Sequence, residues 1–269
     1  MSIRLVACDL DGTLMGKDLT FSPRLLEAMR QAEERGITVT IATGRGFPST
    51  RRFARQLGIT APVICYQGAQ IRTAEGALLH EATLPRENLP EVIAFCHERG
   101  RELALYCNDE IYQTTRMYDG DYYDRWFGLT IHQVDDLLTA IPGDPVKFMV
   151  IAPTKAQADR LEREARDLAA GRFQVVRSHA WFIEGLACGV SKGDSVARLA
   201  RRLGALRKEV MALGDSDNDA SMVEWAGLGV AMGNASDEVK AVADAIAPAQ
   251  AEDGAAWAIE RYALGVETR

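Results

Sequence analysis

This chain alternates short apolar strands with amphipathic helices near both of its ends, and that alternation restricts its fold more than any other feature. In the N-terminal part, the pattern predicts strands at residues 3–8, 37–42 and 62–66, with helices at 23–35 and 48–57 between them. A strand–helix–strand order of this kind predicts a parallel sheet covered by helices on both faces. We therefore expect an open α/β fold that begins at the first strand.

The alternation stops in the middle of the chain. A hairpin is expected over 69–79, and helices are then interspersed with antiparallel strand pairs, an arrangement typical of an α+β unit. The elements predicted there are helices at 85–99 and 154–170 and strands at 102–107, 111–115, 146–152, 173–178 and 181–186.

From Ser191 the α/β order returns. Helices are expected at 192–203, 218–225, 235–243 and 253–263, with strands at 209–213 and 228–231. We therefore predict a discontinuous core domain made of residues 1–82 and 188–269, with residues 83–187 inserted into it as a second domain.

The charge of the chain limits its partners. Its 269 residues include 31 Lys and Arg against 38 Asp and Glu, which gives a net charge of −7. Nucleic acids and anionic membranes attract basic surfaces, so we expect neither as a partner. A small phosphorylated ligand is compatible with this charge, because a local positive pocket can lie within an acidic protein.

The sequence also limits compartment and cysteine chemistry. The longest apolar runs, such as Phe148 to Ala152, are far shorter than the ~20 residues that cross a bilayer. Asp9 and Asp11 lie where the apolar segment of a signal peptide would have to be. The five cysteines and four histidines lack the spacing of a zinc site or a disulfide framework. We therefore expect a cytoplasmic protein with free thiols.

The strongest chemical signal is the run Asp9-Leu10-Asp11-Gly12-Thr13-Leu14, which directly follows the first predicted strand. In an open parallel sheet, ligands bind beyond the carboxyl ends of the strands. Carboxylates two residues apart lie on the same side of an extended chain, so Asp9 and Asp11 can face one ligand. Gly12 permits a turn that a side chain would resist. An ordinary acidic turn is the alternative interpretation.

A second acidic run, Gly214-Asp215-Ser216-Asp217-Asn218-Asp219, follows the strand predicted at 209–213. Three carboxylates in five residues repel one another unless a cation or a base compensates, and oxygen-rich clusters suit Mg²⁺ or Ca²⁺. An EF-hand loop is excluded, because its sixth position would be Ala220 rather than Gly and its twelfth Ala226 rather than Glu. A solvated acidic turn remains the alternative.

Two further segments offer groups for an anion. In Thr43-Gly44-Arg45, after the second predicted strand, a hydroxyl and glycine-exposed backbone N–H groups suit phosphate oxygens. Lys192 lies ahead of a predicted helix, at the return into the core domain. Taken alone, the first segment fits an ordinary turn equally well, and the second fits a solvated surface lysine.

In this order and at these spacings, the four segments resemble the haloacid dehalogenase superfamily of phosphotransferases. The runs Gly229-Val230-Ala231-Met232-Gly233-Asn234-Ala235 and Glu252-Asp253-Gly254 extend the resemblance to the Cof-type subfamily with a type IIB cap. The resemblance covers the whole chain. It implies a Rossmann-like parallel sheet core with helices on both faces, and an inserted α+β cap at 83–187 that sets substrate specificity.

The resemblance also implies catalytic and metal-binding roles. Asp9 is expected to be the nucleophile that forms an aspartyl-phosphate. Asp11 is expected to be the general acid for the leaving alkoxide and then the base that activates water. Mg²⁺ is the expected cofactor, held by Asp9, by the backbone carbonyl of Asp11 and by Asp215.

The remaining matching residues are expected to bind phosphate or to support the site. The transferring phosphoryl group is expected to be held by Thr43, Gly44, Lys192 and Asn218. Supporting roles are expected for Asp219, Thr13 and Gly12.

The chain departs from the family pattern at two places. Gln67-Gly68-Ala69 replaces the usual Asn-Gly-Ala, and Gly185-Leu186-Ala187 replaces the usual Ile-x-Pro. Within the predicted cap, the loop 116–127 carries aromatic and charged side chains that could face substrate or pack in the cap. These side chains are Tyr118, Tyr122, Tyr123, Arg125 and Trp126.

We therefore expect a Mg²⁺-dependent phosphatase acting on small phosphorylated metabolites, with sugar phosphates favoured. A phosphomutase or phosphotransferase would use the same residues with a different acceptor. A metal- and phosphate-binding regulator without turnover is a third interpretation. The Asp9/Asp11 pair argues against it, because binding alone does not need a second acid two residues on.

Overall fold

The computed structural model describes residues 2–115 and 128–266, which form two compact units. The first unit comprises Met1–Gly44, Thr50–Leu79 and Ser191–Arg269, and the second comprises Arg45–Ser49 and His80–Val190. The side chains at 116–127 that were singled out in the predicted cap lie outside the described residues. No helix of the described residues is long and apolar enough to cross a membrane.

The first unit is built on a five-stranded parallel sheet with the order β14-β13-β12-β1-β2. The strands are β1 (Leu5–Cys8), β2 (Thr38–Ile41), β12 (Val210–Gly214), β13 (Leu228–Ala231) and β14 (Ala245–Ile246). All residues of β1 and β12 are buried. Continuous apolar strands of this kind are typical of a parallel sheet that is covered on both faces.

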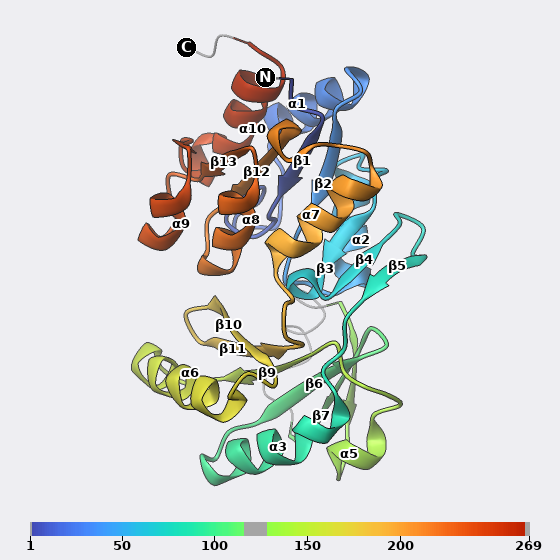
Figure 1. Ribbon diagram of the computed structural model, residues 1–269, viewed down its shortest axis with the longest axis vertical. Coiled ribbons are helices and arrows are strands. Elements are labelled where there is room, and N and C mark those ends of the chain that lie inside the picture. Colours follow the sequence, from blue (N-terminus) through green and yellow to red (C-terminus); the bar gives the residue numbers. More distant parts are fainter. Residues whose placement is uncertain (1, 116–127, 267–269) are drawn as a thin grey trace. The chain divides into compact units, whose positions relative to one another are not determined.

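Helices alternate with these strands along the chain. They are α1 (Pro23–Glu34), α2 (Phe47–Gln56), α7 (Lys192–Arg202), α8 (Ala220–Trp225), α9 (Asp237–Val242) and α10 (Gly254–Ala258). Helix α7 packs beside α8, and α1 packs beside α10 and β2. Figure 1 shows α7 and α8 crossing in front of the strands and α1 behind them. The predicted parallel core with helices on both faces is confirmed.

The third predicted strand only partly joins the parallel sheet. Strand β3 (Val63–Cys65) meets the end of β2 through a single parallel bridge between Ala42 and Ile64. It then pairs antiparallel with β4 (Gln70–Arg72), which neighbours β5 (Leu78–Glu81) in a small separate sheet. The turn between β3 and β4 has positive φ at three consecutive residues, Tyr66, Gln67 and Gly68.

The second unit contains a six-stranded sheet with the order β10-β11-β9-β6-β7-β8, in which only β7 and β8 run parallel to each other. Its strands are β6 (Leu103–Cys107), β7 (Glu110–Gln113), β8 (Thr130–Gln133), β9 (Lys147–Ile151), β10 (Gln174–His179) and β11 (Phe182–Leu186). The predicted α+β character is therefore confirmed.

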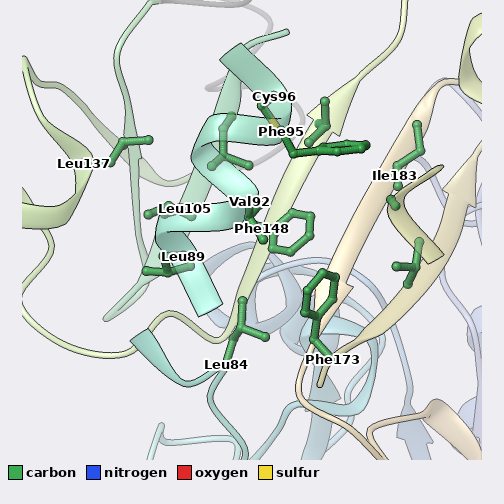
Figure 2. Close-up of a cluster of buried hydrophobic side chains, with 14 of the residues drawn as sticks. Leu84, Leu89, Val92, Phe95, Cys96, Leu105, Leu137, Phe148, Phe173 and Ile183 are labelled. Carbon is green, nitrogen blue, oxygen red and sulfur yellow. The ribbon is translucent and has the colours of Figure 1, made fainter. Parts of the chain in front are cut away.

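One face of this sheet carries the apolar core of the second unit. Helices α3 (Leu89–Glu98) and α6 (Lys155–Ala169) contribute apolar side chains that meet those of the strands. Figure 2 shows Val92 of α3 beside Phe148 of β9, whose ring meets Phe173 edge to face at 5.6 Å. A Cβ at Gly185 would lie 2.0 Å from the Phe148 ring, so this packing requires the glycine at one departure from the family pattern.

Several short elements differ from the sequence predictions. Strand β8, strand β14 and the four-residue helix α5 (Leu137–Ala140) were not predicted, since they are too short for a period to be recognised. Helix α3 begins at Leu89 after a 3₁₀ turn over Arg86–Asn88, later than predicted. The last predicted helix is α-helical only to Ala258 and continues as a π-helix over Ile259–Ala263.

Candidate active site

Three predicted site residues follow parallel strands that end at the same edge of the core sheet. Cys8, the last residue of β1, is level with Leu213 of β12 and with Ile41 of β2. The chain therefore places Asp9, Thr43 and Asp215 just beyond the carboxyl ends of adjacent strands. The backbone N–H of Asp9 still donates to Leu213 O at 3.0 Å, which holds the start of the loop against β12.

A buried lysine joins two of the acidic residues. The Nζ of Lys192 lies 2.6 Å from Asp9 Oδ1 and 2.6 Å from Asp219 Oδ1, and only 1% of the lysine side chain is exposed. Lys192 is the first residue of α7, whose N-cap Ser191 accepts a hydrogen bond from the Asp194 N–H. The local capping signal thus begins the helix at the position that points the lysine at Asp9.

Both carboxylate oxygens of Asp219 accept hydrogen bonds. Its Oδ1 meets Lys192, while its Oδ2 accepts hydrogen bonds from the backbone N–H groups of Asp215 and Ser216, each at 3.0 Å. A Cβ at Gly214 would lie 2.4 Å from Asp219 Cβ, so the close approach of this side chain requires glycine there. The geometry suits a residue that orients the acidic loop.

Asp215 contacts two residues of the loop after β1 that were predicted to support the site. Its Oδ1 accepts a hydrogen bond from Thr13 Oγ1 at 3.0 Å. A Cβ at Gly12, where φ is +88°, would lie 2.3 Å from Asp215 Oδ2. The predicted supporting residues Thr13 and Gly12 therefore both contact this carboxylate, one through a hydrogen bond and one by leaving room for it.

Three carboxylates of the first unit lie close enough together to share one cation. Asp9, Asp215 and Asp219 each offer an oxygen within 4.8 Å of the others. An all-oxygen donor set of this charge fits a hard divalent ion such as Mg²⁺ better than a soft metal. The side chain of Asp11 is not in this group, and its expected contribution is the backbone carbonyl.

Burial and the neighbouring charges shift the pKa values of the titratable residues in this site. Burial, then the charge of Asp219, raises the pKa of Asp9 well above its ordinary value, and Lys192 opposes that shift. Burial, followed by the charge of Asp219, raises the pKa of Asp215 to about 7. Burial lowers the pKa of Lys192, but the carboxylates of Asp219 and Asp9 raise it more, so the lysine stays charged. Ionisation of Asp9 and Asp215 is therefore disfavoured in the metal-free site, and a further cation would stabilise their carboxylate forms.

The residues predicted to hold phosphate meet around Gln67. Gln67 is buried, its backbone N–H donates to Thr43 O at 3.0 Å, and its Oε1 accepts a hydrogen bond from Asn218 Nδ2 at 2.8 Å. Its Nε2 would lie 2.3 Å from a Cβ at Gly44. Asn218 and Gly44 are thus neighbours of the Gln67 side chain and Thr43 of its backbone, whereas Lys192 lies with Asp9 and Asp219.

The sequence did not indicate the contacts that Gln67 and Asn234 make with predicted site residues. Gln67 had been noted only as a departure from the family pattern. The Nδ2 of Asn234 donates to Gly12 O at 2.9 Å and lies 3.5 Å from Asp215 Oδ2, while its Oδ1 accepts from the Gln250 N–H. The signal for Asn234 was its place in the run 229–235, which carried the resemblance without any role being assigned to it.

Comparison with known proteins places this geometry among hydrolases. The family model described as haloacid dehalogenase-like hydrolase matches residues 6–259. The curated 5-amino-6-(5-phospho-D-ribitylamino)uracil phosphatase YcsE of Bacillus subtilis is 29% identical over 98% of this chain and 97% of its own length. The Arabidopsis thaliana protein named Endoribonuclease YBEY, chloroplastic, is 28% identical, but the chain spans only 46% of it.

Solved structures share the fold over nearly the whole chain. A haloacid dehalogenase-like hydrolase from Bacteroides thetaiotaomicron has a TM-score of 0.85 and 30% identity, covering 97% of this chain and 99% of its own. A structure titled as a HAD subclass IIB sugar phosphatase has a TM-score of 0.82, covering 96% of this chain and 98% of its own. At 21% identity it shows the fold alone.

Proposed function

This chain belongs to the haloacid dehalogenase-like hydrolases and is a phosphatase, and from that premise we propose that it hydrolyses small phosphate esters through an aspartyl-phosphate on Asp9, with Mg²⁺ as cofactor. One observation carries the proposal. Lys192 Nζ lies 2.6 Å from Asp9 in a buried site where Asp215 and Asp219 add two more carboxylates. A nucleophile oriented by a lysine, beside a cluster that can bind a cation, is what phosphoryl transfer needs.

In the first step, Asp9 attacks the phosphorus atom and the ester P–O bond breaks. Asp11 gives its proton to the departing alkoxide, which leaves as an alcohol. The approach of a carboxylate to a phosphate dianion is opposed by repulsion, and Lys192 offsets part of that charge at the attacking oxygen.

In the second step, Asp11 takes a proton from water. That water attacks the phosphorus atom, the Asp9–phosphate bond breaks, and inorganic phosphate leaves with Asp9 restored as a carboxylate. Division of the reaction into two displacements lowers the barrier of each. Thr43, Gly44, Lys192 and Asn218 hold the phosphoryl group in both steps.

Mg²⁺ would be held by Asp9, by the backbone carbonyl of Asp11 and by Asp215. When bound there, it supplies Lewis-acid stabilisation of the phosphate oxygens and offsets the carboxylate charge. The raised pKa of Asp9 and of Asp215 is compatible with this assignment, because burial and the charge of Asp219 disfavour the carboxylate forms that a bound cation would stabilise. Asp219 is proposed to orient the loop, since its oxygens already meet Lys192 and two backbone N–H groups.

We further propose that residues 83–187 act as a cap that selects the substrate of a core made of residues 1–82 and 188–269. Sugar phosphates are the favoured substrates. The YcsE name describes a substrate with a phosphorylated ribityl chain, which has the polyhydroxyl character of a sugar phosphate. A small polar phosphate ester also suits a protein of net charge −7 better than a polyanion would.

The test is a phosphate-release screen over sugar phosphates, nucleotides, pyridoxal phosphate and flavin mononucleotide, with Mg²⁺ and with EDTA. We expect Mg²⁺-dependent release that is fastest with a sugar phosphate. Rapid acid quench followed by peptide mass spectrometry should find phosphate on the peptide that carries Asp9. Full activity in metal-free protein would overturn the cofactor assignment, and transfer to a sugar hydroxyl in preference to water would identify a mutase.

A further inference from the structure

We propose that Gln67 is a positioning residue for phosphate binding, which orients the amide of Asn218 and packs against Gly44. The inference rests on the proposed function, since it concerns the residues assigned to the phosphoryl group. Gln67 lies at the turn between β3 and β4, outside the acidic segments and the lysine segment. It is only 2% exposed, so its carboxamide is committed to contacts within the protein.

The first argument is the hydrogen bond to Asn218. Gln67 Oε1 accepts from Asn218 Nδ2 at 2.8 Å, across 151 residues of chain. The Oδ1 of Asn218 is buried and has no hydrogen-bond partner among the described residues. The bond to Gln67 is therefore the described interaction that fixes the rotation of this amide. It uses one of the two N–H groups on Nδ2 and leaves the other to donate to a phosphate oxygen.

The second argument is the contact with Gly44. The three atoms closest to a Cβ built at Gly44 all belong to the carboxamide of Gln67, with Nε2 at 2.3 Å, Cδ at 2.8 Å and Oε1 at 3.3 Å. Gly44 does not have a positive φ, so its backbone conformation does not itself demand glycine. The carboxamide of Gln67 therefore accounts for the absence of a side chain at this phosphate-binding position.

The third argument is the way in which the turn itself is held. Gln67 has φ +61° and ψ 19°, a left-handed conformation that is unfavourable for a residue with a side chain. Its N–H donates to Thr43 O, and the next carbonyl, that of Gly68, accepts from Ser195 Oγ of α7 at 2.6 Å. A strained turn anchored both to the loop after β2 and to α7 holds its side chain in a fixed direction.

The length of the side chain matters in this arrangement. Its terminal amide must meet Asn218 on one side and cover the Cα of Gly44 on the other. Methionine preserves the length and approximate volume of glutamine but cannot accept this hydrogen bond with comparable strength. The substitution Gln67→Met therefore separates the hydrogen bond from the packing.

The experiment is a double-mutant cycle in the Mg²⁺-saturated full chain with p-nitrophenyl phosphate as substrate. We expect Gln67→Met to lower kcat/KM about tenfold, the loss of one well-placed hydrogen bond. The inhibition constant of inorganic phosphate should rise by a similar factor. In an Asn218→Ala background, Gln67→Met should cause no further loss, because its partner is already gone.

Gln70→Met is the matched control, since Gln70 is also buried and its Oε1 accepts from Arg72 rather than from a site residue. Its kcat/KM should stay within about twofold of wild type, with a similar change in Tm to that of Gln67→Met. Losses from Gln67→Met and Asn218→Ala that multiply, or a Gln67→Met enzyme as active as wild type, would overturn the inference. If the wild type itself releases no phosphate, the proposed function fails instead.

A second experiment tests the packing contact between Gln67 and Gly44. Gly44→Ala should be strongly impaired in the wild-type background, because the new methyl group meets the Gln67 amide. In a Gln67→Ala background, the same substitution should cost at least about threefold less in kcat/KM, since the space is then open. Equal losses from Gly44→Ala in both backgrounds would contradict the proposed contact.

Discussion

The molecule buries a lysine against carboxylate in each of its two units, and the two sites differ in charge balance. In the first unit, Lys192 contacts both Asp9 and Asp219, and Asp215 completes a cluster of three carboxylates. In the second unit, Lys147 meets Glu184 at 2.7 Å, with both side chains at most 4% exposed.

The second site is balanced within its own sheet. Glu184 also accepts a hydrogen bond from Ser178 Oγ, and Lys147 Nζ lies 4.6 Å from the centre of the Tyr106 ring. Among the described residues, a group of three potential metal ligands occurs around Lys192 and not around Lys147. Burial is therefore common to both lysines, and the excess of carboxylate groups is found around Lys192.

The largest effect is expected from Asp9→Asn, which removes the proposed nucleophile from the charged site. An amide is a poor nucleophile, so turnover should fall by at least about 10³-fold. Phosphate release with saturating Mg²⁺ measures the effect. Asp217→Asn, in an exposed position of the neighbouring acidic loop, is the control and should retain near wild-type activity. Wild-type activity in Asp9→Asn would remove Asp9 from its role.

The substitution Lys192→Met tests whether this lysine acts in phosphoryl transfer, in contrast to Lys147. Loss of this charge leaves Asp9 and Asp219 facing each other without a counter-charge, and the developing negative charge of phosphoryl transfer loses its stabilisation. We expect kcat/KM to fall by about 10²–10³-fold even at saturating Mg²⁺. A variant less than tenfold impaired would show that the lysine mainly holds the fold.

Lys147→Met should instead act on stability. It leaves Glu184 buried without its ion-pair partner, at an expected cost of about 3–5 kcal/mol in the free energy of unfolding. The fraction that remains folded should keep kcat within a few-fold of wild type. Lys147→Met with Glu184→Met should recover much of the stability, because an apolar pair of similar volume is tolerated. A selective loss of kcat without loss of stability would break the contrast between the two lysines.

The smallest expected effect is the dependence of thermal stability on pH. Because the pKa of Asp215 is raised to about 7, the metal-free folded protein keeps a proton that the unfolded chain releases above its ordinary value of 3.8. This contribution to stability is complete below about pH 4 and is lost as the pH rises to about 7. In EDTA, wild-type Tm should therefore fall relative to Asp215→Asn over this range, by roughly 2–5 °C.

Mg²⁺ should reverse this dependence of Tm on pH. The ion binds the carboxylate form, so the increase in Tm on its addition should be larger at the upper end of this range and small in Asp215→Asn. Thermal unfolding with and without Mg²⁺ measures this without reference to activity. An equal Mg²⁺ effect in Asp215→Asn would exclude Asp215 as a ligand.

The sequence predicted those parts of the molecule that local pattern determines. The parallel strands were recognisable because they are apolar throughout, and Asp9 and Asp215 could be placed at one edge because each directly follows such a strand. The β4–β5 hairpin was expected over 69–79, but its pairing with β3 was not, since that pairing depends on a turn with positive φ at two residues other than glycine. The division of roles between core and cap stays a prediction.

Side-chain contacts between segments far apart in the chain could not be predicted from the sequence. Asn218 and Gln67 are 151 residues apart, and Asn234 and Gly12 are 222 residues apart, so no spacing rule connects them. Asp219 was expected only to support the site. Its contacts with Lys192 and with two backbone N–H groups could not be predicted from spacing. Conversely, the requirement for glycine at 185 followed only from the position of the Phe148 ring.

The pairing of β1 with β12 has a consequence for synthesis of the chain on the ribosome. Leu5 pairs with Val210, and Lys192 follows Asp9 by 183 residues. At about 5–20 residues per second, roughly 10–40 s separate the emergence of Asp9 from that of its lysine. During that interval the first strand is exposed without its neighbour β12, while the intervening residues of the second unit can already fold. The second unit can therefore become compact before Asp9 and Lys192 are able to meet.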